Sequence, residues 1–203
     1  LNAGAADNVV LITLDGLRWQ EVFFGLDRQL ALSDDYSGLS DELMNEYWDD
    51  SAGLRAQKLL PFLHDVVFEK GSYVGNRDQG SCAKVSNDWY FSYPGYSEIL
   101  TGIVNPAINS NRKMANPERS IFELLNTVPE FNGRSAAFAS WDVFPFILNT
   151  ERSGLHVNAF YKEAEPQSEF ETLLNRLYED TPPPWATVRN DSFTHHYAMS
   201  YFK

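Results

Sequence analysis

The sequence is poor in several residue types that define particular classes of protein. It has 203 residues and only one cysteine, Cys82, so it cannot form an intrachain disulfide and is not a disulfide scaffold. It contains no apolar run long enough to span a membrane as a helix. Basic residues are scarce, with 16 Lys and Arg against 28 Asp and Glu, and the net charge is −12. This charge argues against a nucleic-acid backbone or an anionic membrane as the partner.

The rest of the composition is that of a folded α/β protein. Hydrophobic residues make up 43% of the chain, and 203 residues are enough to bury a sizeable core. Predicted strands and helices alternate along the chain, with no repeat and no linker that would separate two cores. We therefore expect one α/β domain over residues 1–203, with a mostly parallel sheet and helices on both of its faces.

The first apolar run predicts a buried strand that ends in a carboxylate. Residues 8–14 are almost continuously apolar and rich in β-branched side chains, and Asp15 and Gly16 follow them. Such a run is typical of a strand in a parallel sheet. Asp15 would then lie at the carboxyl end of the strand, where open α/β sheets bind their ligands. A carboxylate is costly to bury there unless it is paired or binds a metal ion.

A second stretch, Phe91–Gly102, predicts a hydroxyl group at the start of a helix. Ser92 precedes a turn that Pro94 and Gly95 favour, and the helix-compatible run Tyr96–Leu100 follows. Free backbone N–H groups and the positive end of the helix dipole would favour a phosphate or sulfate at this position. The alternative is an ordinary loop-to-helix junction with a serine near the N-cap.

Taken together, the two stretches resemble the alkaline phosphatase superfamily, and in particular its type I phosphodiesterase/nucleotide pyrophosphatase branch. The resemblance is carried by Val10–Trp19, by Ser92–Tyr96 and by the pair Thr101-Gly102 that ends the next helix. In that branch the strand-end Asp binds a metal ion, and a Ser or Thr two residues before a Pro is the nucleophile. The resemblance thus implies that Asp15 is a metal ligand and that Ser92 is both nucleophile and ligand to the same ion.

The resemblance also implies a reaction, which is the hydrolysis of a small phosphorylated substrate through a covalent phospho-enzyme on Ser92. The family uses two divalent metal ions, for which we expect zinc, with Mn²⁺ or Mg²⁺ as alternatives. An Asn in the loop over residues 103–116 would donate to a phosphoryl oxygen, and we assign this role to Asn111, with Asn109 as the alternative. The motifs do not choose between diester, pyrophosphate and monoester substrates.

The family takes its other metal ligands from later motifs, which are an Asp followed four residues on by a His, an Asp-His pair and a last His. No Asp-His pair occurs here, and we assign none of these motifs to this chain. The chain therefore resembles the N-terminal half of the family domain. We expect the 203 residues alone to lack the remaining ligands, to bind metal weakly and to expose an apolar sheet edge that favours oligomers.

Two other functions stay open. A sulfatase of this superfamily would need Cys or Ser followed by x-Pro-x-Arg, and Tyr96 stands in the place of that Arg. A non-catalytic binding module would keep the fold and lack the metals. The small, uncharged residues Leu1–Ala6 are compatible with the end of an export signal, so we expect a periplasmic or secreted protein, with a cytoplasmic location as the alternative.

The remaining segments predict further elements and weaker site candidates. We expect helices at residues 17–24, 59–69, 120–127 and 167–178 and after Asp191, and strands at 72–74, 135–139 and 154–159. The acidic insert at about 25–57 lacks the EF-hand spacing, so we expect a solvated cap over the active site and not a calcium site. Asp142 follows a predicted strand and is a minor site candidate. His195 and His196 point about 100° apart on a helix, which favours a structural role.

Overall fold

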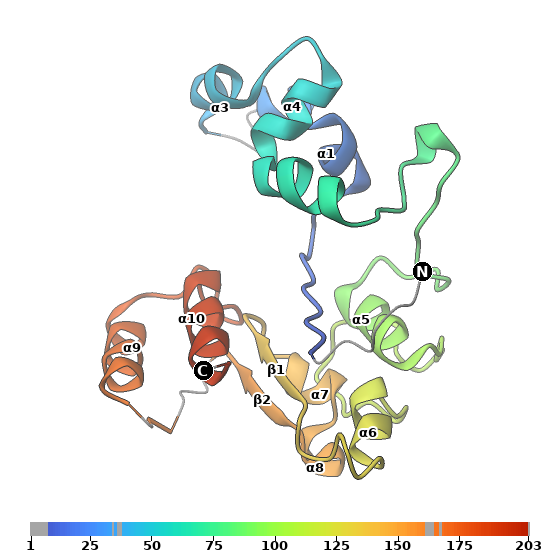
Figure 1. Cartoon of the computed structure of the whole chain (residues 1–203), viewed down its shortest axis with the longest axis vertical. Helices are drawn as coiled ribbons and strands as arrows, with labels where there is room; N and C mark the ends of the chain where they lie inside the picture. The colour runs from blue at the N-terminus through green and yellow to red at the C-terminus, as the bar shows by residue number, and fades with distance from the viewer. Residues whose placement is uncertain (1–7, 34, 36–37, 161–164, 167, 203) are drawn as a thin grey trace. The chain divides into compact units, whose positions relative to one another are not determined.

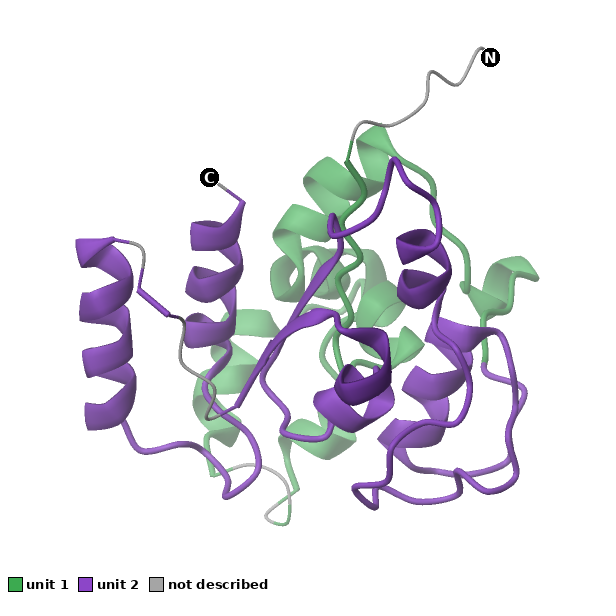
Figure 2. Ribbon diagram, turned by 90° about the horizontal axis from the view of Figure 1, so that it is seen from below, with its two compact units in different colours: residues 1–84 green, residues 85–203 purple. Residues whose placement is uncertain are grey.

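The computed structural model describes residues 8–33, 35, 38–160, 165–166 and 168–202, so the predicted export segment Leu1–Ala6 lies outside the described residues. The chain forms two compact units, Leu1–Lys84 and Val85–Lys203, which Figure 2 colours separately. The expectation of a single domain over residues 1–203 stays a prediction. No helix in the described part of the chain is long and apolar enough to cross a membrane.

The described part of unit 1 is helical. Its elements are α1 (Trp19–Phe24), α2 (Arg28–Ala31), α3 (Ser40–Tyr47), α4 (Ala52–Leu59), the π-helix η1 (Leu63–Phe68) and the 3-10 helix η2 (Arg77–Gln79), as Figure 1 shows. The predicted helices at residues 17–24 and 59–69 are therefore confirmed, the second with a π-helical centre. The acidic insert carries α2, α3 and α4.

Helix α1 packs against α4 at a glycine. Gly25 ends α1 with a φ of +73°, and a Cβ built there would lie 2.2 Å from the carbonyl carbon of Arg55. The Arg55 side chain fixes the same contact, because its Nε donates to the carbonyl of Phe24 at 3.1 Å and its guanidinium lies over the Trp48 ring at 4.6 Å. His64 joins η1 to α1, with its Nε2 2.8 Å from the carbonyl oxygen of Val22.

Two predicted strands of unit 1 are wrong. Residues 8–14 form no strand in the structure, and five of their apolar side chains are 58–86% exposed: Val9, Val10, Leu11, Ile12 and Leu14. Residues 72–74 are also without strand structure, and Val74 is exposed. A β-branched run becomes a strand only where a neighbouring strand supplies hydrogen-bond partners. In the described residues, the only strands that pair in a sheet lie in unit 2.

Unit 2 combines helices with a two-stranded parallel sheet (Figure 1). Its elements are α5 (Ser92–Thr101), α6 (Ile121–Asn126), β1 (Ala136–Ala139), α7 (Phe144–Ile147), α8 (Thr150–Ser153), β2 (His156–Ala159), α9 (Glu169–Asp180) and α10 (Asp191–Tyr201). In the register of the sheet, Ala136 pairs with His156 and Ala139 with Ala159. The predicted strands at 135–139 and 154–159 are thus confirmed, and the mixed α/β character with them.

Helices cover both faces of this sheet, as Figures 1 and 2 show. Because side chains alternate along a strand, Ala137 and Ala139 face one hydrophobic cluster and Phe138 faces another. The first cluster includes side chains of α5 and α7, among them Tyr93, Tyr96, Leu100 and Ile147. The second consists of side chains of α9 and α10, namely Leu174, Tyr178, Phe193 and Tyr197.

The two C-terminal helices differ in detail from the prediction. In α9, Leu174 and Tyr178 are buried. Helical spacing places Phe170, Leu173 and Leu177 on the same apolar face as Leu174, but these three side chains are 42–51% exposed, so the face is only partly buried. Helix α10 begins one residue earlier than expected: Asn190 is its N-cap, and Asp191, the expected cap, is its first helical residue.

Candidate functional site

Helix α5 starts at the predicted nucleophile. Phe91 is an extended N-cap residue, Ser92 is the first helical residue, and Pro94 occupies the first turn, where its missing N–H costs no helical hydrogen bond. The helix ends at Gly102, which has a φ of +71° and donates its N–H to the carbonyl of Glu98 at 2.8 Å. The Thr101-Gly102 pair therefore ends this helix, as the sequence predicts. Ser92 itself is half-buried.

The loop before α5 is fixed to the same helix through Glu98. Its carboxylate accepts hydrogen bonds from the backbone N–H groups of Ser86 and Asn87 and from the side-chain amide of Asn87. The Asn87 side chain and these N–H groups lower the pKa of Glu98. The carboxylate thus holds residues 86–87 against the helix that begins with Ser92.

Asn111 lies next to the predicted nucleophile. Its side-chain Oδ1 accepts a hydrogen bond from the backbone N–H of Tyr93 at 3.0 Å, so the loop over residues 103–116 returns to the first turn of α5. The phenol oxygen of Tyr93 lies 2.7 Å from the carbonyl oxygen of Met114 and 3.3 Å from that of Phe146. Tyr93 is completely buried, and burial raises its pKa to about 12. The segment 111–114 therefore follows the Tyr93 side chain from its backbone to its hydroxyl group.

The first turn of α5 has a donor left for a ligand. Pro94 has no N–H, and the N–H of Tyr93 is bonded to Asn111. Within the described parts of the chain, the N–H of Ser92 and the side-chain NH₂ of Asn111 have no hydrogen-bond partner. The hydrogen bond between Asn111 and the Tyr93 N–H brings the asparagine to the residue after Ser92. Both donors suit an anion, and the partial positive charge at the start of the helix favours an anion there too.

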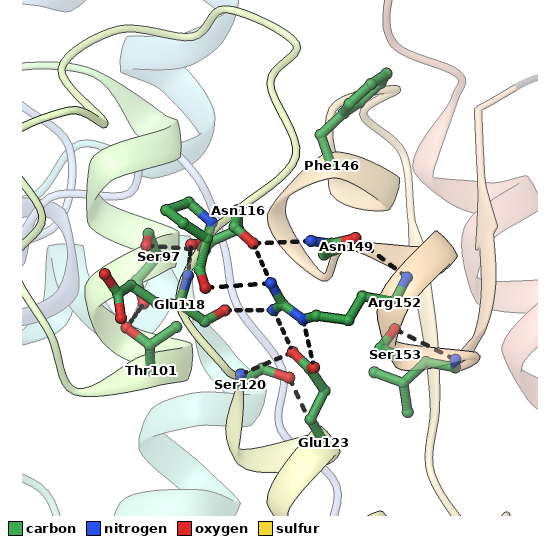
Figure 3. A network of polar contacts seen from close by, with 12 residues as sticks. Ser97, Thr101, Asn116, Glu118, Ser120, Glu123, Phe146, Asn149, Arg152 and Ser153 are labelled. Carbon is green, nitrogen blue, oxygen red and sulfur yellow. Dashed lines mark hydrogen bonds and ion pairs between the residues drawn. The ribbon is translucent and has the colours of Figure 1, made fainter.

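The far end of the same loop is held by a network of polar contacts, which Figure 3 shows. The Arg152 guanidinium on α8 donates to the backbone carbonyls of Asn116, Pro117 and Glu118 at 2.7–3.1 Å. It also pairs with the carboxylate of Glu123 at 2.8 Å and thereby lowers the pKa of that group. One guanidinium thus ties the loop to α6 and α8.

Asn116 completes the network from the side of α5. It is fully buried, and its side-chain amide donates to the Ser97 hydroxyl at 3.0 Å (Figure 3). Ser120 caps α6 by accepting from the N–H of Glu123, whose carboxylate accepts in return from the N–H of Ser120. The loop that carries Asn111 is therefore fixed at both of its ends, at Tyr93 and at the Arg152 network.

Asp142 is joined to the same loop. It follows β1, its backbone N–H donates to the carbonyl of Thr187, and its Oδ2 lies 2.5 Å from the Nζ of Lys113. Its side chain is 15% exposed, and its Oδ1 is buried without a partner among the described residues. The sequence singled out Asp142 but not Lys113, which lies two residues after Asn111. A loop lysine gives no signal by itself, so only the fold identifies this pair.

Asp15 lies in unit 1, in an exposed turn with Gly16, whose φ is +80°. Ser92 and Asn111 lie in unit 2, so the predicted sharing of a metal ion by Asp15 and Ser92 stays a prediction. Unit 1 also has an open, polar hollow of about 430 Å³, lined by Gly53, Gln57, His64, Asp65 and Glu69, and no predicted site residue lines it.

The histidines of unit 2 lie away from Ser92 in sequence and contact aromatic rings. His156 stacks on Tyr201 with ring centroids 5.2 Å apart, and His195 and His196 are exposed neighbours on α10. The sequence argument missed that Asp191 and His195 have the Asp-x-x-x-His spacing, which places them on one face of α10. The Asp191 carboxylate accepts a hydrogen bond from Ser140. Among the described residues, no three His, Cys, Asp or Glu side chains are grouped to hold a metal ion.

We compared the chain with models of protein families, with curated proteins and with solved structures, and found no match among any of them.

Proposed function

We propose that this protein is a metal-dependent phosphoester hydrolase with Ser92 as its nucleophile. The observation that carries the proposal is the hydrogen bond from the Tyr93 N–H to the Asn111 side chain. It brings the asparagine that the family resemblance assigns to phosphate binding next to the serine that it assigns to attack. The two residues were assigned from separate stretches of sequence, so their meeting supports both assignments.

The roles of these residues follow from the chemistry of phosphoryl transfer. The Ser92 oxygen attacks phosphorus, a bond between this oxygen and phosphorus forms, and the bond to the leaving oxygen breaks. The Ser92 N–H and the Asn111 NH₂ donate to non-bridging oxygens, where negative charge is stabilised during the transfer. The dipole of α5 acts in the same direction. Water then releases the phosphate and restores the serine hydroxyl.

The metal requirement comes from the family resemblance alone. A bound divalent ion lowers the pKa of a hydroxyl group that it contacts, which makes the group a nucleophile at neutral pH. The donors assigned so far are the Asp15 carboxylate and the Ser92 hydroxyl, and a catalytic zinc usually has three protein ligands. The described residues therefore do not fit a complete two-metal centre by themselves, and the proposal requires further ligands.

Anion binding tests the site directly. We expect orthovanadate and inorganic phosphate, titrated with and without Zn²⁺ or Mn²⁺, to bind the 203-residue chain. Ser92→Ala and Asn111→Ala should each weaken the binding about tenfold or more, because each removes a hydrogen bond or a ligand to a charged group. Asn109→Ala changes the alternative asparagine, at an exposed position in the same loop, and should leave the affinity unchanged if Asn111 has the assigned role. Absence of binding by the unmodified chain would contradict the proposal.

Covalent labelling separates the hydrolase from a non-catalytic binding module. Once the further metal ligands that the proposal requires are supplied, incubation with a chromogenic phosphodiester or monoester and the metal ion should place a phosphoryl group on Ser92, detected by intact mass spectrometry, and none in Ser92→Ala. The binding module is the second candidate because no grouped metal ligands occur in the described residues. It predicts anion binding without label and without turnover. Release of sulfate from an aryl sulfate in preference to phosphate would favour the sulfatase.

A further inference from the structure

Lys113 is in the loop that carries Asn111. Only Arg112 separates the two residues, so their Cα atoms are at most about 7 Å apart. Asn111 contacts the backbone of Tyr93, and Met114, on the other side of Lys113, contacts its hydroxyl group. Lys113 is therefore on the part of the loop that follows Tyr93, next to the first turn of α5.

Asp142 fixes the position of the Lys113 ammonium. The two groups are 2.5 Å apart, and the lysine side chain is 47% exposed while the aspartate side chain is 15% exposed. The charged end of Lys113 is thus held in place and still reaches solvent. Arg112, the neighbouring cation, is exposed and has no hydrogen bond or ion pair within the described residues. Of these two adjacent cations, only Lys113 is held by a partner.

The pair is poorly explained by stability alone. Partly exposed ion pairs contribute little to folding, and the Oδ1 of Asp142 is buried without a partner among the described residues. A buried acceptor without a donor is unfavourable and calls for an explanation. An ammonium ion that is held at some cost in stability, two positions from Asn111 in the same loop, is understandable if it contacts the bound anion.

We propose that Lys113, positioned by Asp142, binds the second negative charge of a phosphate monoester and makes the site selective for monoesters over diesters. This inference rests on the proposed function, since it uses the same phosphate site. A monoester is largely a dianion at neutral pH, because its second pKa is about 6, whereas a diester carries a single charge. A lysine ammonium is a compact point charge that suits such an extra charge.

The selectivity of binding tests the inference. Phenyl phosphate serves as the monoester and diphenyl phosphate as the diester, each titrated into the 203-residue chain by calorimetry. We expect Lys113→Met to weaken the binding of phenyl phosphate roughly 10- to 100-fold, because a hydrogen bond to a charged group is lost. The binding of diphenyl phosphate should weaken by less than about threefold. Arg112→Met, the matched control, should change both affinities by less than about threefold.

Two further variants separate a ligand contact from a change of local charge. Lys113→Arg should keep most of the monoester preference, because it keeps the positive charge. Lys113→Met leaves the Asp142 carboxylate without its partner. The double variant Lys113→Met with Asp142→Asn removes this unpaired negative charge as well. We expect the double variant to remain weak for phenyl phosphate; recovery of the full affinity would show that only the aspartate charge acts, which overturns the inference.

The outcomes for the two proposals differ. If phenyl phosphate binds in a manner that depends on Ser92 and Asn111, but Lys113→Met weakens both ligands equally or neither, the selectivity proposal fails and the phosphate site stands. If the unmodified chain binds neither ligand, both proposals fail. Thermal unfolding of each variant confirms that the compared proteins are folded.

Discussion

Among single residues, Arg152 makes the largest set of contacts to the loop of the candidate site. We expect Arg152→Met to lower the free energy of unfolding by about 2–3 kcal/mol, because it removes hydrogen bonds to three backbone carbonyls and the pair with Glu123. Urea denaturation measures the change. The control is Arg176→Met in α9, an exposed arginine whose loss should cost less than about 0.5 kcal/mol. Similar losses in the two variants would contradict the network's assigned role.

Tyr93 gives the site a distinct dependence on alkaline pH. Burial raises its pKa to about 12, above the ordinary value of 10. Because the folded pKa exceeds the unfolded one, the contribution of the neutral phenol is fully present below pH 10 and is lost as the pH rises to 12. The free energy of unfolding should therefore fall more steeply over this range in the wild type than in Tyr93→Phe, which cannot ionise.

At neutral pH, Tyr93→Phe should itself be less stable by about 1 kcal/mol, because the hydrogen bond to the Met114 carbonyl is lost. Urea unfolding at a series of pH values measures both effects. Tyr90→Phe, at a fully exposed tyrosine, should keep the wild-type slope. If Tyr93→Phe also keeps that slope, folding does not raise the pKa of the Tyr93 phenol above its unfolded value.

At the scale of elements, the contact between α1 and α4 depends on one glycine. Gly25→Ala should destabilise unit 1 by roughly 2–4 kcal/mol, because φ is +73° and the new Cβ would overlap the Arg55 backbone. Gly53→Ala, inside α4, should stabilise it by about 0.5–1 kcal/mol, because its Cβ meets nothing closer than Ser51 Oγ at 4.0 Å. Thermal unfolding shows whether each variant is less or more stable than the wild type. A Gly25→Ala variant as stable as the wild type would mean that α1 and α4 are free to separate.

The elements that the sequence predicts well are those whose signals are local. Helix α5 has Pro94 in its first turn and Gly102 after its last, and α6 has a serine cap with a glutamate three residues later. Strand β1 is a short apolar run, and it pairs with β2, in which polar and apolar side chains alternate. Residues 8–14 have an equally apolar pattern, but a strand needs a neighbour, and local sequence does not say whether one is present.

The same distinction applies to the candidate site. Ser92 was predictable because helix signals surround it, and Asn111 was predictable only through the family resemblance. Lys113 and its pairing with Asp142 were not predictable, because the two residues are 29 positions apart and only the return of the loop to β1 joins them. Arg152 was missed for the same reason, since an arginine in a short helix does not reveal that its partners are backbone carbonyls of a distant loop.

At the scale of the whole molecule, the proposed mechanism requires residues of both units. Asp15 belongs to unit 1, and Ser92 and Asn111 belong to unit 2. Unit 1 also exposes the apolar residues 9–12, which is a liability for a protein in water. The proposed mechanism assigns Asp15 and Ser92 to the same metal ion.

We therefore predict that Asp15 and Ser92 approach each other closely enough to bind one metal ion. Cysteines introduced as Asp15→Cys and Ser92→Cys, in a Cys82→Ser background, should form a disulfide or react with a short bifunctional thiol reagent, because a disulfide requires Cα atoms within about 7 Å. The control pair is Asp27→Cys with Ser92→Cys, which keeps one cysteine in each unit but moves the first one away from the predicted ligand. Cross-linking should be much faster for the first pair, as measured by the mobility or mass of the product. Equal rates for the two pairs would show that Asp15 is not part of the Ser92 site, and the metal would then need a different first ligand.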